Sequence, residues 1–569
     1  MVSLSDIIAL MKQQILADIL RAVKELRIDL SADDQKKIKV EYPDASMGDY
    51  SSNAALILSK LAKTSPSQLA DQIIGKLDKY HFETVEKAGP GFINFKLNHA
   101  AYLAMLAQDQ PKLEVQLEKF LVEYFQPNIA KPLHMGHLET AIFGDSVYRC
   151  LKYLGHHVES DTHMGDWGTQ FGLLILAYKK YGTEAEVTKD PVNILNGYYI
   201  KINQDAEADP SVHEAGKQEF VKLEKGDEEN RRIWKQFVDW SMEKFLTIND
   251  LMDIKPFDHH WPESFYEDKM PAVLAELTEK GLLVESQGAQ IVNLESVGLG
   301  VAVVVKSDGG TTYLLRDLAT FIYRKSLGFT KQVYVVDNRQ GHAFLQLFAI
   351  LKAMGAANEG EAIHMDYGFI SFKGAALSTR KGNMVLAHDV IAQAEEKVGA
   401  IIAQKNPDLA NKEKVINAIA KGSLKYYFLS HNRHSDIEFD WDQALDFNGN
   451  SGPYLQYTYA RLSSIIRKVG EEASVPSDAA LTETEKQLIL EMTKLNEVVV
   501  ESVQDYLPNT LANYVYGLTN LANKFYHESP VAAESDEKKK SLRIALIQKT
   551  RATLKTALDL LGIQALEEM

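Results

Sequence analysis

Residues 127–138 read Pro-Asn-Ile-Ala-Lys-Pro-Leu-His-Met-Gly-His-Leu, and they follow an apolar stretch, Phe120 to Phe125, that is typical of a buried strand. Pro132 is suited to the entry of a helix, because its φ is fixed and its missing N–H would be unpaired there. His134 and His137 are three residues apart, so their imidazoles lie on one face of the first helical turn. The stretch therefore predicts a strand, a turn and a helix that begins with a histidine pair.

The start of such a helix is suited to a phosphate group, because its free N–H groups and the positive end of its dipole favour an anion. Neutral imidazoles can donate hydrogen bonds to phosphate oxygens. Gly136 leaves space for a flat group to approach the backbone. Two surface histidines would also satisfy this pattern, and the other motifs of the chain favour the phosphate site.

The composition is that of a globular protein with several domains. The chain has 569 residues, with 45% hydrophobic and 25% charged residues. Its single cysteine, Cys150, excludes an internal disulfide framework and a cysteine-based zinc site. Because the first residues, 1–12, lack the pattern of a secretory signal and no apolar run is long enough for a bilayer, we expect a cytoplasmic protein with no membrane partner.

The formal net charge of −16 is unusual for a protein that binds nucleic acid. It does not exclude such a partner, since a local basic face can bind while acidic residues elsewhere limit non-specific association.

Three units are predicted along the chain. Residues 1–112 combine helical patterns with a turn and an alternating strand, which indicates a small α+β domain. Residues 113–410 alternate strand-like and helix-like stretches, as in an α/β fold with a parallel sheet, and they contain a mostly helical insertion at about 185–285. Strands of this sheet are expected at 120–125, 156–161 and 332–336, with the sheet resuming near 301–306.

Strand signals fade after about residue 410, and residues 411–569 predict an all-α helical bundle. The expected helices cover residues 415–429, 454–469, 482–506, 511–527 and 541–561.

Further motifs follow the histidine pair in a fixed order. Residues 377–383 read Leu-Ser-Thr-Arg-Lys-Gly-Asn, which alone would be typical of a solvated basic turn. The others are Asp161 to Gly172 (Asp-Thr-His-Met-Gly-Asp-Trp-Gly-Thr-Gln-Phe-Gly), Tyr313 to Asp317 (Tyr-Leu-Leu-Arg-Asp) and Asp446 to Tyr454 (Asp-Phe-Asn-Gly-Asn-Ser-Gly-Pro-Tyr).

Together these motifs resemble those of class I aminoacyl-tRNA synthetases, and specifically of the arginyl-tRNA synthetases. His134 to His137 is similar to the HIGH signature of the class, and 377–383 to its KMSKS signature. The resemblance runs from Gly48 to the last helix. It implies a Rossmann-like catalytic domain, an N-terminal domain that contacts the tRNA elbow, and a C-terminal anticodon-binding domain.

The resemblance implies an arginine–tRNA ligase that activates L-arginine with ATP and then charges tRNA(Arg), with activation requiring bound tRNA. The expected partners are tRNA(Arg), L-arginine and ATP with Mg²⁺, with no structural zinc or other protein-bound metal, and the expected state is a monomer. The predicted catalytic residues are His134, His137, Lys131, Arg380 and Lys381. The predicted ATP-binding residues are Gly136, His134, His137, Ser378, Thr379 and Lys381.

Two departures from the family pattern bear on the ATP site. The usual lysine pair of the second signature is not present in its usual order, and some arginyl enzymes appear to use the lysine before HIGH instead, which is Lys131 here. Glu139 stands where the family often has a basic residue.

Recognition of arginine requires carboxylates, because the guanidinium is planar, always charged and best bound by a bidentate fork. Asp317 and Glu263 are the best candidates for this role, although an Arg316–Asp317 pair at an ordinary helix start would explain Asp317 as well. The full predicted set carried over from the family is Glu123, Asn128, Glu263, Tyr313, Asp317 and Gln340.

Aromatic and polar side chains of the C-terminal bundle could stack on anticodon bases and hydrogen-bond to their edges. The candidates are Tyr454, Gln456, Tyr459 and Arg461, for each of which a place in the bundle core is an equally good explanation.

Three other functions remain open at this level. They are a tRNA-binding paralogue without activity, a class I ligase for another amino acid such as lysine, and a small nucleotidyltransferase, which shares H-x-G-H but would not explain the helical bundle.

Overall fold

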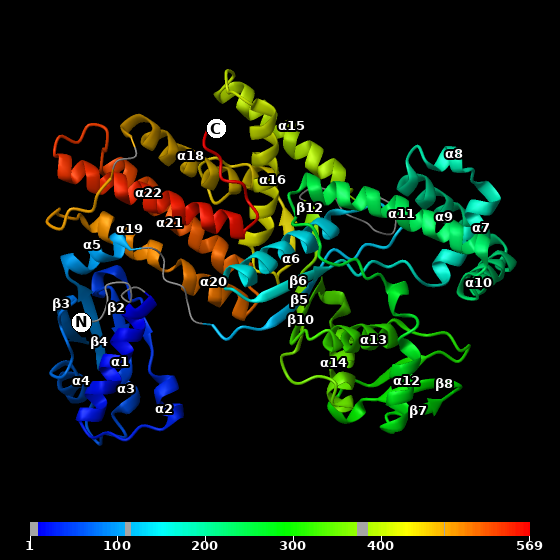
Figure 1. The fold of residues 1–569 in the computed structure, drawn as a ribbon, viewed down its shortest axis with the longest axis horizontal. Coiled ribbons are helices and arrows are strands. Elements are labelled where there is room, and N and C mark those ends of the chain that lie inside the picture. Colours follow the sequence, from blue (N-terminus) through cyan, green and yellow to red (C-terminus); the bar gives the residue numbers. More distant parts are fainter. Residues whose placement is uncertain (1–8, 109–114, 373–384, 471–472) are drawn as a thin grey trace.

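A computed structural model describes residues 9–108, 115–372, 385–470 and 473–569. The parallel sheet lies near the middle of the molecule, with the N-terminal unit and the helical bundle on one side and two smaller lobes on the other (Figure 1). None of the helices in the described ranges is both long and apolar enough to cross a membrane.

The N-terminal unit is the predicted α+β domain. Its antiparallel sheet has the order β1-β2-β4-β3, and it rests on the bundle, where Lys12 pairs with Glu497 at 2.6 Å. Ser65 caps the fourth helix, since its hydroxyl accepts a hydrogen bond from the backbone N–H of Gln68. The elements are α1 (Ala9–Glu25), α2 (Ala32–Lys37), β1 (Val40–Glu41), η2 (Ala45–Met47), β2 (Tyr50–Ser52), α3 (Ala54–Leu58), α4 (Pro66–Ile74), β3 (Phe82–Ala88), β4 (Phe92–Leu97) and α5 (His99–Ala107).

The central sheet has the order β11-β10-β5-β6 and is parallel throughout. From β5 (Lys119–Glu123) the chain passes through α6 (Met135–Tyr153) to β6 (His157–Asp161) on one side. It later returns to β10 (Lys331–Asp337) and β11 (Ala362–Tyr367) on the other side, with α14 (Gly341–Met354) between them. The strand order therefore reverses between β5 and β10, and ligands of open α/β sheets bind at the carboxyl ends of the strands at such a point.

One strand prediction is wrong in its placement. Residues 301–305 do form a strand, β9 (Val301–Val305), but β9 pairs with β8 (Ala289–Asn293) in a separate antiparallel sheet that also contains β7 (Leu283–Ser286). Ala302 and Val304 are buried whereas Val301 and Val303 are exposed. This alternation is typical of a sheet covered on one face only, not of a central parallel strand. Strand β11 was not predicted.

The insertion is mostly helical, as expected, and forms the outer lobe seen at the upper right of Figure 1. It is followed by a second small lobe that contains β7 to β9. The helices here are α7 (Thr169–Tyr181), α8 (Glu184–Val187), α9 (Pro191–Ala208), α10 (Pro210–Glu224), α11 (Glu228–Leu251), η3 (Glu263–Tyr266), α12 (Met270–Glu279), η4 (Glu295–Val297), α13 (Tyr313–Ser326) and η5 (Asn338–Gln340).

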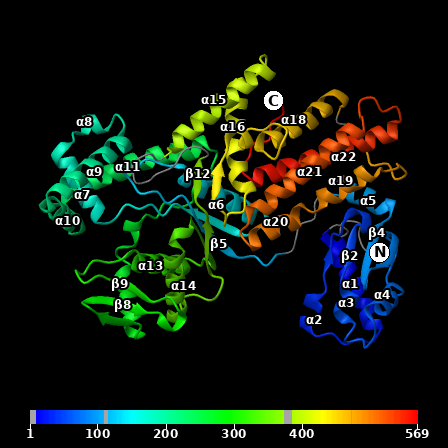
Figure 2. The same ribbon diagram turned by 180° about the vertical axis from the view of Figure 1, so that it is seen from behind.

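The C-terminal part is the predicted bundle, seen from behind in Figure 2. The helix expected over 482–506 is two helices that meet at Lys494, and a short strand after residue 410, β13, pairs with β12. The elements are β12 (Ile370–Phe372), α15 (Ala387–Lys405), α16 (Lys412–Ser430), β13 (Ile437–Phe439), α17 (Trp441–Ala444), α18 (Gly452–Val469), α19 (Glu483–Thr493), α20 (Leu495–Gln504), α21 (Pro508–Glu528) and α22 (Glu537–Leu560).

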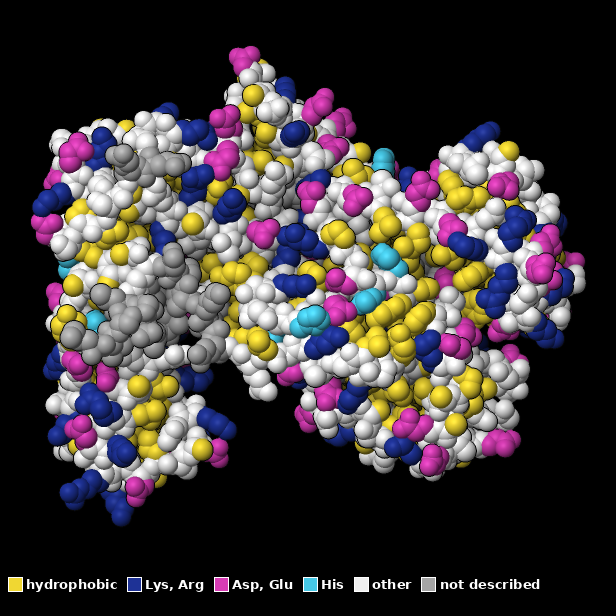
Figure 3. Space-filling view, viewed as in Figure 1, with side chains coloured by type: hydrophobic (Ala, Val, Ile, Leu, Met, Phe, Trp, Pro, Cys, Tyr) yellow, Lys and Arg dark blue, Asp and Glu magenta, His cyan; other side chains and the backbone are white. Residues whose placement is uncertain are grey.

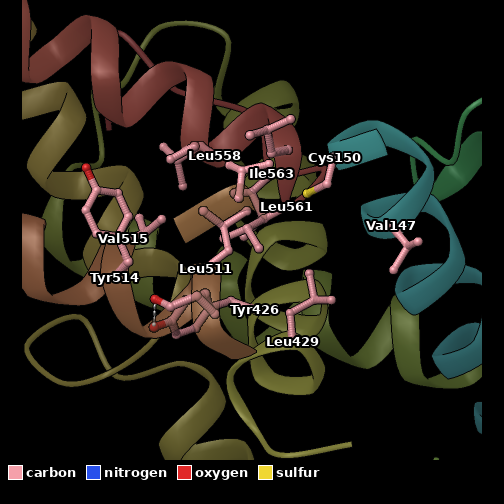
Figure 4. Close-up of a cluster of buried hydrophobic side chains, with 14 of the residues drawn as sticks. Val147, Cys150, Tyr426, Leu429, Leu511, Tyr514, Val515, Leu558, Leu561 and Ile563 are labelled. Carbon is pink, nitrogen blue, oxygen red and sulfur yellow. Dashed lines mark hydrogen bonds between the residues drawn. The ribbon is translucent and has the colours of Figure 1, made fainter. Parts of the chain in front are cut away.

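Helix α6, which begins with the histidine pair, is fixed to the bundle along its second half. Figure 4 shows Cys150 of α6 in one buried cluster with Tyr426 and Leu561. The Ser146 hydroxyl donates to the Leu560 carbonyl at 3.1 Å, and Arg149 pairs with Asp559. The bundle therefore supports the helix on which the histidines lie.

Candidate active site

A cavity of about 650 Å³ opens at the carboxyl ends of β5, β10 and β11, at the reversal of the strand order. Figure 3 shows histidine, basic and acidic side chains close together near the middle of one face of the molecule. The cavity wall contains these predicted residues: Glu123, Asn128, His134, Gly136, His137, Glu263, Tyr313, Asp317 and Gln340. The structure thus brings together the two histidines and the whole predicted arginine set, which come from six separate segments.

The two histidines lie against each other at the start of α6, with ring centroids 3.8 Å apart. The backbone N–H of His134 donates a hydrogen bond to His137 Nδ1 at 3.1 Å. Nδ1 is therefore an acceptor, and the proton of a neutral His137 ring lies on Nε2. Burial lowers the pKa of both rings, that of His137 well below its usual value, and the neighbouring Arg339 lowers that of His134 further. The pair is neutral near pH 7 and offers N–H donors.

The loop between β5 and α6 is held in an uncommon conformation. Phe125 and Ala130 are buried residues with φ of 61° and 60°, in the left-handed region that non-glycine residues seldom adopt. The backbone N–H of Ile129 donates to the Gly165 carbonyl at 3.0 Å, and a Cβ on Gly165 would lie 2.0 Å from Asn128 Oδ1. Such strain persists where surrounding contacts enforce it, often at functional sites. Here it fixes Asn128 at the cavity wall.

Asp317 is an acidic residue of the cavity wall. It lies one turn after Tyr313 on α13, and within the described residues no hydrogen bond or ion pair reaches its side chain. Burial, followed by the nearby Glu123 carboxylate, raises the pKa of Asp317 to about 7. An acceptor-only group in this position is suited to a cationic ligand.

The other two predicted carboxylates have partners within the protein. Glu263 accepts from Arg316 Nη1 at 3.4 Å, yet burial dominates and raises the pKa of Glu263 to about 8. Glu123 pairs with the fully buried Arg324 at 2.5 Å. Asp317 is therefore the most available of the three for a bound guanidinium.

Glu123, Asp161 and His163 are close enough to resemble a metal site. The guanidinium of Arg324 lies between the two carboxylates, with Nη1 2.5 Å from Glu123 and Nη2 2.5 Å from Asp161. The Arg324 guanidinium supplies the positive charge that a metal ion would bring. Its two ion pairs compensate for the burial of both carboxylates.

Arg316 and Arg324 were missed by the sequence analysis as members of the site. Both lie on α13, and Arg324 is in its last turn, where basic residues are common for reasons of the helix dipole alone. No local signal distinguishes a buried arginine there from an exposed one. Arg339 of the cavity wall, an exposed residue paired with Asp337 at 2.6 Å, was also missed.

Lys131 does not line the cavity. It is half-buried, its Nζ lies 5.5 Å from the ring centroid of Tyr199 on α9, and burial lowers its pKa. Its predicted catalytic role is not tested by this position.

The second signature, with Ser378, Thr379, Arg380 and Lys381, lies outside the described residues. The residues on both sides of it are at the cavity. Gly368 to Ile370 line the wall before it, and after it the Val385 carbonyl accepts from Met135 N–H at 3.2 Å. The backbone N–H of Ala387 likewise donates to the Leu133 carbonyl at 2.9 Å.

Two of the four predicted tRNA contacts are wrong. Gln456 is fully buried and donates to the carbonyls of Ala418 and Gln564, and Tyr459, 2% exposed, hydrogen-bonds to Glu567. Both are core residues, since α18 packs against helices on several sides.

Tyr454 and Arg461 are partly exposed and stay predictions. Arg461 lies over the rings of Tyr457 and Tyr526, both more than a third exposed, so these three side chains form a flat surface patch on the bundle.

Comparison with known proteins covers the whole chain. Residues 12–97 match the family described as arginyl tRNA synthetase N terminal domain, residues 100–441 that described as tRNA synthetases class I (R), catalytic domain, and residues 455–569 the DALR anticodon binding domain.

Among curated relatives, the arginine–tRNA ligase of Alkaliphilus metalliredigens is 37% identical over 93% of this chain and 94% of its own length. That of Streptococcus thermophilus is 38% identical over 98% of this chain and 100% of its own length. Among solved structures, Thermus thermophilus arginyl-tRNA synthetase has a TM-score of 0.83 at 26% identity and covers 98% of this chain and 100% of its own. The Plasmodium falciparum arginyl-tRNA synthetase shares the fold, with a TM-score of 0.82 at 24% identity over 98% of this chain and 99% of its own.

Proposed function

Because this chain belongs to the arginyl-tRNA synthetase family and is an arginine–tRNA ligase, we propose that the cavity between β5 and β10 is where arginine is activated. The observation that carries this proposal is the joint presence, in one cavity, of a neutral histidine pair at a helix start and an unpaired carboxylate, Asp317. The first is suited to the phosphates of ATP and the second to the guanidinium of arginine. Charging of total tRNA with each amino acid in turn tests it, and we expect arginine alone to be attached.

In the first step the arginine carboxylate attacks the α-phosphate of ATP, which forms arginyl-adenylate and releases pyrophosphate. This reaction requires positioning and charge stabilisation more than covalent work by the protein. The Nε2–H of His137 is set to donate to a phosphate oxygen, because its Nδ1 is already held by the backbone. His134 lies beside it, and the N-terminal dipole of α6 adds to the effect.

Arginine itself is held at the other end of the cavity. Asp317 accepts a bidentate pair of hydrogen bonds from the guanidinium, and Tyr313, which is well exposed on the same helix, closes over it. Glu263, whose pKa burial raises to about 8, adds a carboxyl group on that side. The α-amino group of arginine is bound by Asn128, by Gln340 and by the Glu123 oxygen that also accepts from Gln126.

Positive charge stabilises the pyrophosphate as it leaves. Mg²⁺ arrives with ATP and is held largely by the phosphates. The remaining stabilisation of the pyrophosphate comes from Lys131, Arg380, Lys381 and the hydroxyls of Ser378 and Thr379. In the second step a ribose hydroxyl at the tRNA 3′ end attacks the adenylate carbonyl and releases AMP.

Arginine affinity should fall with acidity. Asp317 must be ionised to pair with the guanidinium, and its pKa in the free protein is raised to about 7. Binding lowers that pKa, so arginine affinity should weaken below pH 7, by up to about tenfold per pH unit, and binding should release a proton. Titration calorimetry at pH 6 to 8, in two buffers of different ionisation enthalpy, measures the arginine affinity and the number of protons released. A pH-independent affinity with no proton release would show that Asp317 is not the partner.

Activation should require tRNA. Arginine-dependent ATP–pyrophosphate exchange is expected only when tRNA(Arg) is present, with tRNA for another amino acid as the control. Full exchange without tRNA would remove this part of the proposal and leave the assignment of the cavity intact.

A further inference from the structure

Glu139 is a buried acid in the cavity wall that the reaction described above does not use. It lies on α6, two residues after His137, and is 1% exposed. Within the part of the chain that the structure describes, no hydrogen bond or ion pair engages its carboxyl group. Its neighbours are other acids, so it has no obvious structural role as an ion.

The surroundings disfavour the charged form of Glu139. Burial has the largest effect and raises its pKa well above the usual value, and the carboxylates of Asp337 and Asp436 raise it further. Arg339 of the same cavity wall is already engaged by both oxygens of Asp337, at 2.8 and 2.6 Å. These surroundings therefore favour the protonated form of Glu139, which carries an O–H donor.

A buried donor without an acceptor costs free energy, and here only the cavity lies open to it. Glu139 lies among residues from the ends of β10 and β11, such as Asp337, Tyr367 and Gly368, which line the cavity near the histidine pair. The predicted arginine-recognition residues come instead from the end of β5 and the loop after it, from η3, from α13 and from η5. The position of Glu139 therefore favours a contact with the nucleotide over a contact with the amino acid.

We propose that Glu139 is an ATP-binding residue of this chain and donates a hydrogen bond to an oxygen of the nucleotide. This inference rests on the proposed place of ATP beside His134 and His137. A neutral acid can approach a polyanion that a carboxylate would repel, so an acid serves as a donor in a negatively charged complex.

The test compares Glu139→Leu with Glu139→Gln in aminoacylation, with tRNA present. Leucine fills a similar volume without a donor, and we expect the KM for ATP to rise about 10- to 100-fold with the KM for arginine unchanged. Glutamine keeps an N–H donor and should bring the KM for ATP back to within about threefold of the wild type. Glu485→Gln, at a buried acid far from the cavity, is the control for loss of a buried carboxyl group, and thermal unfolding reports on folding of each variant.

A pH series adds a readout that a structural role would not give. The titratable groups that act on Glu139 or respond to it are Asp337 of β10, Tyr367 of β11 and Asp436 before β13, while His137 and Arg339 line the same cavity. As Glu139 ionises with rising pH, the wild-type KM for ATP should rise, whereas that of Glu139→Gln should stay flat.

An unchanged KM for ATP in a folded Glu139→Leu protein would overturn the inference and leave the proposed function standing. If the wild-type protein itself showed no ATP-dependent charging of tRNA with arginine, the proposed function would fail first. Equal pH profiles for wild type and Glu139→Gln would also overturn the inference.

Discussion

Replacing Asp317 by asparagine should raise the KM for arginine by roughly 30-fold or more, because losing one partner of a buried charge pair costs about 2–5 kcal/mol. The amide keeps the shape of the carboxylate and removes its charge. The KM for ATP should change little, since Asp317 lies at the arginine end of the cavity. Steady-state aminoacylation with each substrate varied in turn measures both constants.

A matched control is Asp268→Asn. Asp268 is an exposed acid paired with Lys269, outside the cavity wall. We expect its KM for arginine to stay within about twofold of the wild type, as for other exposed ion pairs. Equal constants in wild type and Asp317→Asn would mean that another group binds the guanidinium.

Replacing His137 by alanine should lower kcat by about 10²- to 10³-fold, the usual loss when one preorganised donor to developing negative charge is removed. The Nε2–H is fixed toward the cavity by the contact of Nδ1 with the His134 backbone, so its donor is oriented before ATP binds. Rapid-quench measurement of the first turnover separates activation from transfer and product release. The loss should appear in activation.

His156→Ala provides the comparison for this variant. His156 Nδ1 also accepts a backbone N–H, that of Glu118 at 3.2 Å, but it lies at the amino end of β6, across the sheet from the cavity. Its loss should leave the activation rate unaffected. If His137→Ala activated arginine as fast as His156→Ala, His137 would not stabilise the transition state.

The order of the three units could be predicted from the periodicity of the sequence. The predicted residues that line the cavity could be recognised from the sequence motifs. His134 and His137 follow a buried strand and a turn, which places them at the carboxyl edge of a parallel sheet. The strand over 301–305 was misplaced because a short apolar run does not state which sheet it joins.

The misassigned tRNA contacts have a different cause. Gln456 and Tyr459 are amphipathic or polar, yet α18 is covered on several sides, so even polar positions of this helix are enclosed and hydrogen-bonded inside the bundle. Arg324 was missed for the converse reason. Arginine is usually exposed, and the burial of Arg324 is made possible by Glu123 and Asp161, which are distant in sequence and are brought beside it by the sheet register.

Selection of arginine by the Asp317 carboxylate is tested most directly by the affinities of arginine and citrulline, its uncharged isostere, measured by titration calorimetry with tRNA(Arg) bound. An ion pair in the cavity predicts that citrulline binds at least about 100-fold more weakly than arginine. Equal affinities would contradict recognition by charge at Asp317.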